Sequence, residues 1–228
     1  MRSIRMLVPV AVLFGAVVVA ASEQQPAPAT GATQASVKPI DVPQGNGAPV
    51  ITDGIFSRGE WDDAERIDVD EGVTLYVKEW RGVVFIGLRG QGQNGIGPSE
   101  LSLGAPGGPI EKLHVSFGLA QVVLPPTGPE PRMRVGLTTE WYANEFRRDE
   151  EEFARLQKEG KDPREIMRAT SYPSDGIEFA IRRSKFPGPV WMMRLWASAV
   201  VGGKPGMVTY PPAAAERTME GWLQLRFK

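Results

Sequence analysis

The sequence predicts an all-β protein, an antiparallel, jelly-roll-like β-sandwich with a short helical insertion. Two observations lead to this class. Apolar and polar residues alternate over several short runs, and 26 glycines and 20 prolines supply turns between them. Only one stretch, residues 147–169, carries the signals of helices. Short strands joined by turns are typical of two sheets that bury one face each.

The N-terminal residues predict export. Arg2 and Arg5 precede an apolar run, and Val19 and Ala21 suit a cleavage site, so we expect a signal peptide over residues 1–21. Residues 22–49 are rich in Ala, Pro, Gln, Thr and Gly, and we expect a disordered linker there. The folded domain is then expected at 50–228. The protein would be secreted or periplasmic, without stable membrane insertion after cleavage, although an uncleaved signal anchor is the alternative.

Composition excludes several kinds of chemistry. The chain has no cysteine, which excludes thiol catalysis and zinc–thiolate sites. Its net charge of −1 becomes −3 when Arg2 and Arg5 leave with the signal peptide. Because a nucleic-acid partner requires a basic face, we expect no such partner.

The first strong strand signal lies in residues 73–89. Val73, Leu75 and Val77 alternate with polar residues, 80–82 make a turn, and 83–89 are apolar on both faces, as in a central strand. Further strands are expected at 112–117, 133–139, 177–182, 190–201 and 219–227.

The insertion predicts two short helices. Residues 149–159 begin with acidic side chains and end near Lys158, which suits the helix dipole, and Gly160 is a natural stop. Asp162-Pro163, with Glu165 three residues after the cap, predicts the start of a second helix.

Several motifs occur in a recognisable order: Asp53-Gly54, residues 59–64 (Gly-Glu-Trp-Asp-Asp-Ala), Trp80 at a hairpin tip, and Asp175-Gly176-Ile177-Glu178. This order resembles the family 9 carbohydrate-binding modules and the wider DOMON-like group. The resemblance implies an exported jelly-roll-like sandwich that stacks aromatic rings on sugar, with structural calcium in some members and haem in one branch. The chain departs from the family pattern at Arg182-Arg183, where a proline is usual, and in the helical insertion.

The candidate ligand-binding residues are aromatic and polar. Trp80 and Trp141 would stack on a sugar ring, and Tyr142, Asn144 and Glu178 would supply polar contacts. The alternatives are that Trp80 covers the sandwich edge, Trp141 anchors the insertion and Glu178 is a solvated strand carboxylate. Trp61 is assigned to the core. We expect no catalytic residues and no enzyme.

Cofactor signals are weak. Asp68, Asp70 and Glu71 offer oxygens for calcium, but they lack the spacing of an EF-hand loop, and a solvated turn is favoured. His114, the one histidine, could ligate haem together with Met133, Met192 or Met193. Residues 90–95 match a dinucleotide fingerprint, but helix-breaking residues follow, so we read them as a loop.

Three functions follow from these observations. The favoured one is non-catalytic binding of a saccharide or related glycan. The second is an envelope protein-interaction domain, which an exposed apolar patch around Phe153, Leu156, Ile166 and Met167 would favour. The third is a haem-binding electron carrier.

Overall fold

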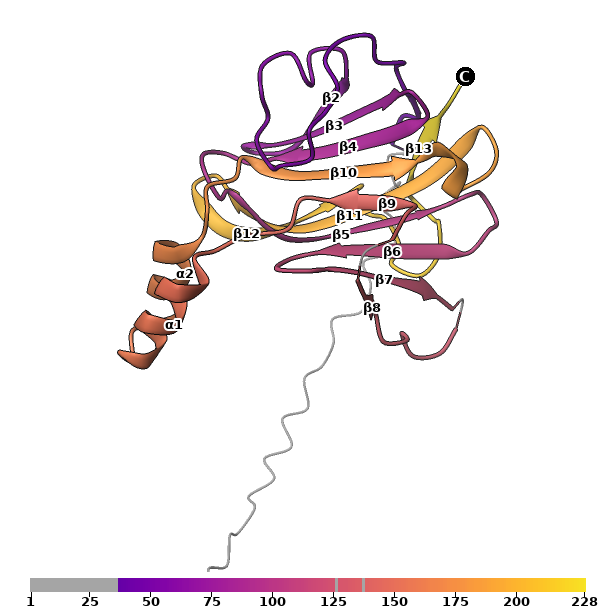
Figure 1. The fold of residues 1–228 in the computed structure, drawn as a ribbon. Helices are drawn as coiled ribbons and strands as arrows, with labels where there is room; N and C mark the ends of the chain where they lie inside the picture. The colour runs from indigo at the N-terminus through magenta and orange to yellow at the C-terminus, as the bar shows by residue number, and fades with distance from the viewer. Residues whose placement is uncertain (1–36, 126, 137) are drawn as a thin grey trace, which may run out of the picture. The chain divides into compact units, whose positions relative to one another are not determined.

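The structure is a computed structural model that describes residues 37–125, 127–136 and 138–228. These residues belong to one compact unit, Gln34–Lys228. The expected signal peptide, residues 1–21, and residues 22–36 of the expected linker lie outside the described residues. Within the described ranges, thirteen strands form two packed sheets, which confirms the all-β sandwich with a short helical insertion (Figure 1).

One sheet, called sheet B, has five strands in the described residues, in the order β2 (Glu65–Asp70), β3 (Val73–Trp80), β4 (Val83–Arg89), β10 (Gly176–Arg182) and β9 (Trp141–Ala143). All its neighbouring strands are antiparallel.

The other sheet, sheet A, has eight described strands. Its order is β1 (Ile40–Asp41), β13 (Leu223–Arg226), β11 (Val190–Val201), β5 (Ile96–Gly104), β6 (Ile110–Val115), β7 (Leu119–Leu124) and β8 (Arg134–Val135), with β12 (Lys204–Tyr210) also paired to β11. Its ladders are antiparallel except that between β1 and β13, which is parallel.

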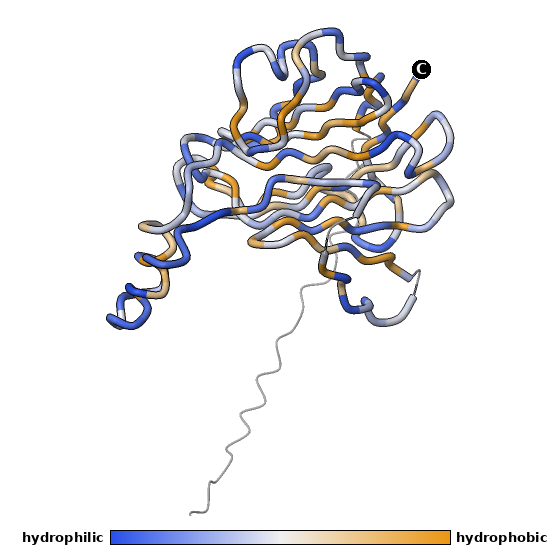
Figure 2. Tube along the Cα trace, in the orientation of Figure 1, coloured by the Kyte–Doolittle hydropathy of each residue, from blue (hydrophilic) through white to orange (hydrophobic). Residues whose placement is uncertain are grey.

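The main core lies between the two sheets. Alternate side chains of the central strands point inward and are fully buried, among them Leu75, Ile86 and Phe179 from sheet B and Leu101 and Trp191 from sheet A. Figure 2 shows the hydrophobic residues along the strands and mostly hydrophilic ones along the loops and helices. Burial of this apolar surface is the principal stabilising contribution to the fold.

The expected linker is wrong for residues 37–49. Ile40 is 7% exposed and pairs with Leu225, and the Val42 amide donates to the Arg226 carbonyl at 2.8 Å. Glu79 of β3 donates its amide to the Pro43 carbonyl at 2.9 Å. Two buried apolar side chains are sufficient to hold this segment, although its overall composition resembles a linker. The folded domain therefore begins before residue 50.

Strand positions agree with the sequence prediction in the central strands and differ elsewhere. The strand expected at 133–139 contains only Arg134–Val135, and that expected at 219–227 contains only Leu223–Arg226. Strand β5 was not expected, because Gly97 and Pro98 read as breakers. Pro98 is tolerated because the β5–β11 ladder is irregular there, between Ala197 and Ala199, so its missing N–H is not needed.

The insertion forms two helices, α1 (Glu150–Lys158) and α2 (Pro163–Thr170), as expected. The Asp149 side chain caps α1 by accepting from the Glu152 amide at 3.0 Å. The base of the pair is clamped, because Asp149 donates its amide to the Thr170 carbonyl at 2.8 Å and Tyr172 donates to Arg147 at 2.9 Å. A short 3-10 turn, η1 (Arg183–Lys185), follows β10.

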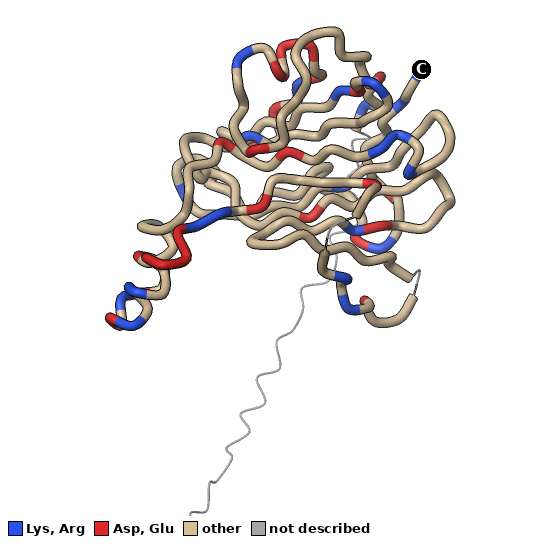
Figure 3. The backbone as a smooth tube through the Cα atoms, in the orientation of Figure 1, with Lys and Arg blue, Asp and Glu red and all other residues tan. Residues whose placement is uncertain are grey.

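The four apolar residues of the expected docking patch are wholly or partly buried among the described residues of the insertion. Ile166 is 3% exposed, and Phe153, Leu156 and Met167 are half-buried. Acidic residues gather in the first turn of α1 and basic residues lie near its end, where Arg155 pairs with Glu152 (Figure 3). In the described residues, no helix is long and apolar enough to cross a membrane.

Candidate functional site

Residues 43–64 cover part of the outer face of sheet B. Trp61 lies against this face and stacks on Phe56, with ring centroids 5.3 Å apart, and Val50 and Phe85 complete a small second core. A Cβ on Gly87 would lie 2.8 Å from Cζ2 of Trp61. Only a glycine therefore leaves room for this indole on β4, and the assignment of Trp61 to the core is confirmed by its 6% exposure.

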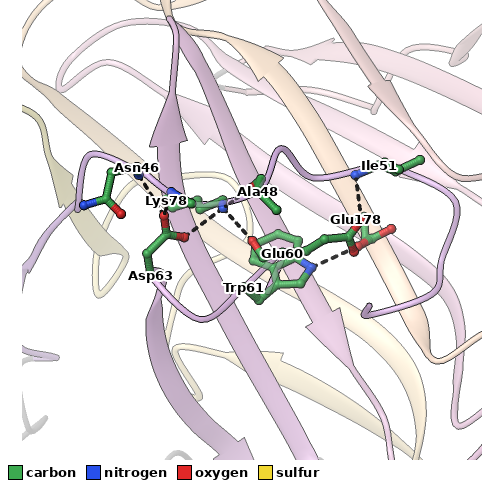
Figure 4. A network of polar contacts seen from close by, with 9 residues as sticks. Asn46, Ala48, Ile51, Glu60, Trp61, Asp63, Lys78 and Glu178 are labelled. Atoms are coloured by element: carbon green, nitrogen blue, oxygen red, sulfur yellow. Dashed lines mark hydrogen bonds and ion pairs between the residues drawn. The ribbon is translucent and has the colours of Figure 1, made fainter. Parts of the chain in front are cut away.

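Glu178 fastens this covering segment to β10 (Figure 4). Its Oε2 accepts from the amides of Asp53 at 3.1 Å and Gly54 at 2.9 Å, and its Oε1 accepts from the Trp61 indole at 3.0 Å. Its side chain is fully buried, so neither the expected ligand contact nor the solvated alternative is correct. The alternation of side chains correctly placed Glu178 on the face opposite Ile177 and Phe179, but residues 43–64 cover that face and exclude water from Glu178.

Burial raises the pKa of Glu178 to about 7. The hydrogen bonds from Gly54 and Trp61 favour the ionised carboxylate and oppose this rise, whereas the nearby carboxyls of Glu60 and Asp53 add to it. The carboxyl therefore titrates near neutral pH while it holds the covering segment.

Asn144 belongs to the same anchor. Its Nδ2 donates to the Gly176 carbonyl at 3.1 Å, and its Oδ1 accepts from the Glu178 amide at 2.6 Å. Gly54 packs against it with φ +84, and a Cβ there would lie 2.6 Å from Nδ2. Both ends of the amide thus hold the backbone, so Asn144 is not free to bind a sugar hydroxyl as expected.

A second anchor joins β3 to the covering segment. Lys78 is fully buried, and its Nζ donates to the carbonyls of Ala48 and Glu60 and pairs with Asp63 at 2.8 Å (Figure 4). Burial alone would raise the pKa of Asp63. The hydrogen bonds from Lys78 and from the Gly47 and Asn46 amides outweigh that effect and hold this pKa below its usual value.

The two predicted tryptophans lie apart. Trp141 is 3% exposed within the main core, where its Nε1 donates to Oε1 of Gln121 at 2.6 Å, so it is a core anchor with no face open to a ligand. Trp80 is half-buried at the end of β3, with the Arg81 guanidinium 4.5 Å from its ring centroid. Tyr142 on β9 lies three strands from Trp80, about 14 Å at the usual strand spacing.

A surface pocket of about 130 Å³ lies beside Tyr142, at the base of the helical insertion. Its walls include Asp53 from the covering segment, Glu145 and Arg147 before α1, and Tyr172 after α2. Tyr142 is 37% and Tyr172 is 56% exposed. Of the predicted site residues, this pocket brings together Tyr142 and Asn144, and it leaves out Trp80, Trp141 and Glu178.

The polar groups of this pocket differ from those of the anchors. In the part of the chain that the structure describes, the side chains of Tyr142, Glu145, Arg147 and Tyr172 make no hydrogen bond or ion pair. Sequence reasoning missed Glu145, Arg147 and Tyr172. Their signal was their position on either side of the insertion, because a helical pair with a clamped base brings its two flanks together.

The residues considered for cofactors are separated. Among the described residues, no three His, Asp or Glu side chains are grouped so as to hold a metal ion. Asp68 pairs with Arg66 and accepts from Thr74 at 3.1 Å. His114 lies 3.5 Å from Glu100 on the outer face of sheet A, whereas Met193 lies in the main core on the inner face. Met192 and Met133 pack in a separate apolar cluster with Trp222, which does not include His114.

The loop at residues 90–95 leads into strand β5 rather than into a helix, which confirms its assignment as a loop. Its Asn94 exchanges hydrogen bonds with Ser174, at 2.6 Å and 3.0 Å, beside the pocket.

Comparison with known proteins does not show a family for this chain. No family model matches the sequence, and no curated protein matches it. A solved structure from Bacteroides uniformis, described as a "putative carbohydrate-binding protein", aligns with a TM-score of 0.39 and 6% identity. The alignment covers 72% of this chain and 86% of that one.

Proposed function

We propose that the protein is an exported, non-catalytic binding module for a saccharide, as its resemblance to family 9 carbohydrate-binding modules implies. The observation that carries the proposal is the pocket between Tyr142 and Tyr172, which combines two exposed phenol rings with unpaired polar groups. Such a combination suits a sugar, which has an apolar C–H face and polar hydroxyls.

Each part of the pocket has a role in this proposal. The rings of Tyr142 and Tyr172 contact the C–H face of the sugar. The Glu145 carboxylate accepts hydrogen bonds from hydroxyls, and the Arg147 guanidinium donates to them. Asp53 contributes through one carboxylate oxygen, because its Oδ1 already accepts from the Ile55 amide at 2.8 Å. Asn144 and Glu178 shape the pocket from behind and make no ligand contact.

The test is calorimetric titration of the mature protein with a panel of soluble mono- and oligosaccharides. We expect saturable binding of at least one saccharide, weakened at least tenfold by Tyr172→Ala. The matched control is Met207→Ala on β12, which removes a side chain that is 72% exposed and lies outside the pocket. A flat response across the panel in folded protein would refute the proposal, and an absorbance spectrum of the same sample tests the haem alternative.

The export component is tested separately. Mass spectrometry of protein recovered from the producing cell should give a chain that begins at Ser22, after cleavage behind Ala21. Recovery of the intact N-terminus would support the signal-anchor alternative instead.

A further inference from the structure

A second cavity adjoins the candidate saccharide pocket. It measures about 170 Å³ and lies on the other side of Arg147 and Tyr172, both of which line the two cavities, as does Phe146. A ligand that occupies the first pocket therefore lies next to the second, because the same three residues line both.

The second cavity is apolar where the first is polar. Its own walls are made by Ile96 and Pro98 of β5, Phe117 of the β6–β7 turn and Met167 of α2. Phe117 is 44% exposed. Among the described residues, the exposed large aromatic side chains are Phe117, Tyr142 and Tyr172. Tyr142 lines the first cavity, Phe117 lines the second, and Tyr172 lines both. An aromatic ring held in water beside a cavity gains free energy when an apolar group covers it.

The walls of the second cavity are held in place. The guanidinium of Arg148 lies between two rings, 4.9 Å from the centroid of Phe117 and 3.7 Å from that of Phe153 on α1. Asn94 also lines the second cavity, and its Oδ1 accepts a hydrogen bond from the Ser174 amide. The cavity is thus formed before a ligand binds, which reduces the entropy lost on binding.

We propose that the ligand is an amphiphilic saccharide, whose sugar occupies the first pocket and whose alkyl or acyl substituent occupies the second. This inference rests on the proposed saccharide-binding function and narrows it to glycosides or esters that carry an apolar group. The three lining residues that the two cavities share argue for one ligand with two chemical parts rather than for two independent ligands. The apolar part contacts Phe117 and Met167, and the shared Tyr172 contacts both parts.

The test measures how affinity depends on chain length. Methyl and butyl β-glycosides of glucose, galactose, mannose and N-acetylglucosamine are titrated into the mature protein by calorimetry, with 1-butanol as the probe without sugar. A fully buried methylene contributes about fourfold in affinity, which is ~0.8 kcal/mol, so three half-buried methylenes should give about eightfold. We expect this gain for at least one sugar.

Variants separate the two cavities. Phe117→Ser and Met167→Ser each remove one apolar wall and should bring the butyl-to-methyl affinity ratio close to one. Tyr142→Ala, which alters only the first pocket, should weaken both glycosides by the same factor and preserve the ratio. Met207→Ser is the control for an exposed apolar residue outside both cavities.

Each result has one meaning. Glycoside binding that requires Tyr142 but gives equal affinities for methyl and butyl forms would overturn the amphiphilic ligand and leave saccharide binding intact. Absence of binding for every methyl and butyl glycoside would overturn both proposals. Binding of 1-butanol as tight as that of the butyl glycosides would identify an independent apolar site, contrary to a single ligand spanning both cavities.

Discussion

Replacement of Glu178 by glutamine should destabilise the fold and change how its stability depends on pH. The carboxylate accepts three hydrogen bonds, two on Oε2 and one on Oε1. A glutamine offers one oxygen, so its NH₂ group must face either the Trp61 indole N–H or the amides of Asp53 and Gly54. At least one buried donor then loses its acceptor, which costs about 1–3 kcal/mol.

The sign of the pH dependence follows from the raised pKa. Glu178 has a pKa of about 7 in the folded protein, against an ordinary value of 4.5 for the unfolded chain, so the folded state binds this proton more tightly. Stability from this group is therefore greatest below pH 4.5 and is lost as pH rises towards 7, by about 3 kcal/mol in all. Glu178→Gln removes this dependence, so the stability difference between wild type and variant should shrink as pH increases.

Urea unfolding of both proteins at pH 5, 6, 7 and 8, followed by tryptophan fluorescence, measures this difference. We expect a larger destabilisation at pH 5 than at pH 8. A difference that is constant across the range would refute the assignment of a near-neutral pKa to Glu178. An unchanged midpoint at every pH would refute its role as an anchor.

Three further predictions follow from the packing. Gly87→Val should destabilise the protein by about 1–3 kcal/mol, because a Cβ meets Trp61 at 2.8 Å, and it should shift the fluorescence spectrum towards that of exposed tryptophan. Trp141→Ala should cost about 3–5 kcal/mol in urea unfolding, since the indole is 3% exposed, and a loss below 1 kcal/mol would contradict its core position. Replacement of residues 149–170 by a short Gly-Ser loop should preserve the far-ultraviolet strand spectrum, because α1 buries no residue and the buried Ile166 of α2 belongs to none of the sandwich core clusters, yet abolish saccharide binding through displacement of Tyr172.

The sequence predicted the sandwich because most of its central strands obey a simple alternation. Val73, Leu75 and Val77 point into the core as that period requires, and α1 has acidic residues in its first turn and Lys158 at its end, as expected. Strands with a weak signal were missed. Strand β5 contains Gly97 and Pro98, and β2 is an edge strand with four charged residues, in which only Ile67 and Val69 pack against the core.

The candidate site was only partly predictable, for a different reason. Glu178 and Asn144 are polar residues at positions that alternation assigns to an outer face, and sequence alone does not show that residues 43–64 cover that face. Tyr142 was selected because it adjoins Trp141 and Asn144 in an aromatic and polar cluster, and the structure shows it 37% exposed on the edge strand β9. Its partner Tyr172 lies thirty positions later, and only closure of the helical pair brings the two together.

The motif residues and the pocket residues differ in whether their polar groups are already hydrogen-bonded, and this difference affects which ligand can bind. Among the residues that resemble the carbohydrate-binding modules, Gly54 and Trp61 donate hydrogen bonds to Glu178, and neighbouring side chains fill the space beside Gly54. Groups that are satisfied inside the protein cannot contribute to recognition without breaking the fold. The unpaired polar side chains of the pocket lie on the two flanks of the insertion instead: Tyr142, Glu145, Arg147 and Tyr172. We therefore expect that related chains with the same motifs but a different insertion share this fold and bind different ligands, which exchange of residues 145–172 between two such chains would test through a corresponding exchange of saccharide preference.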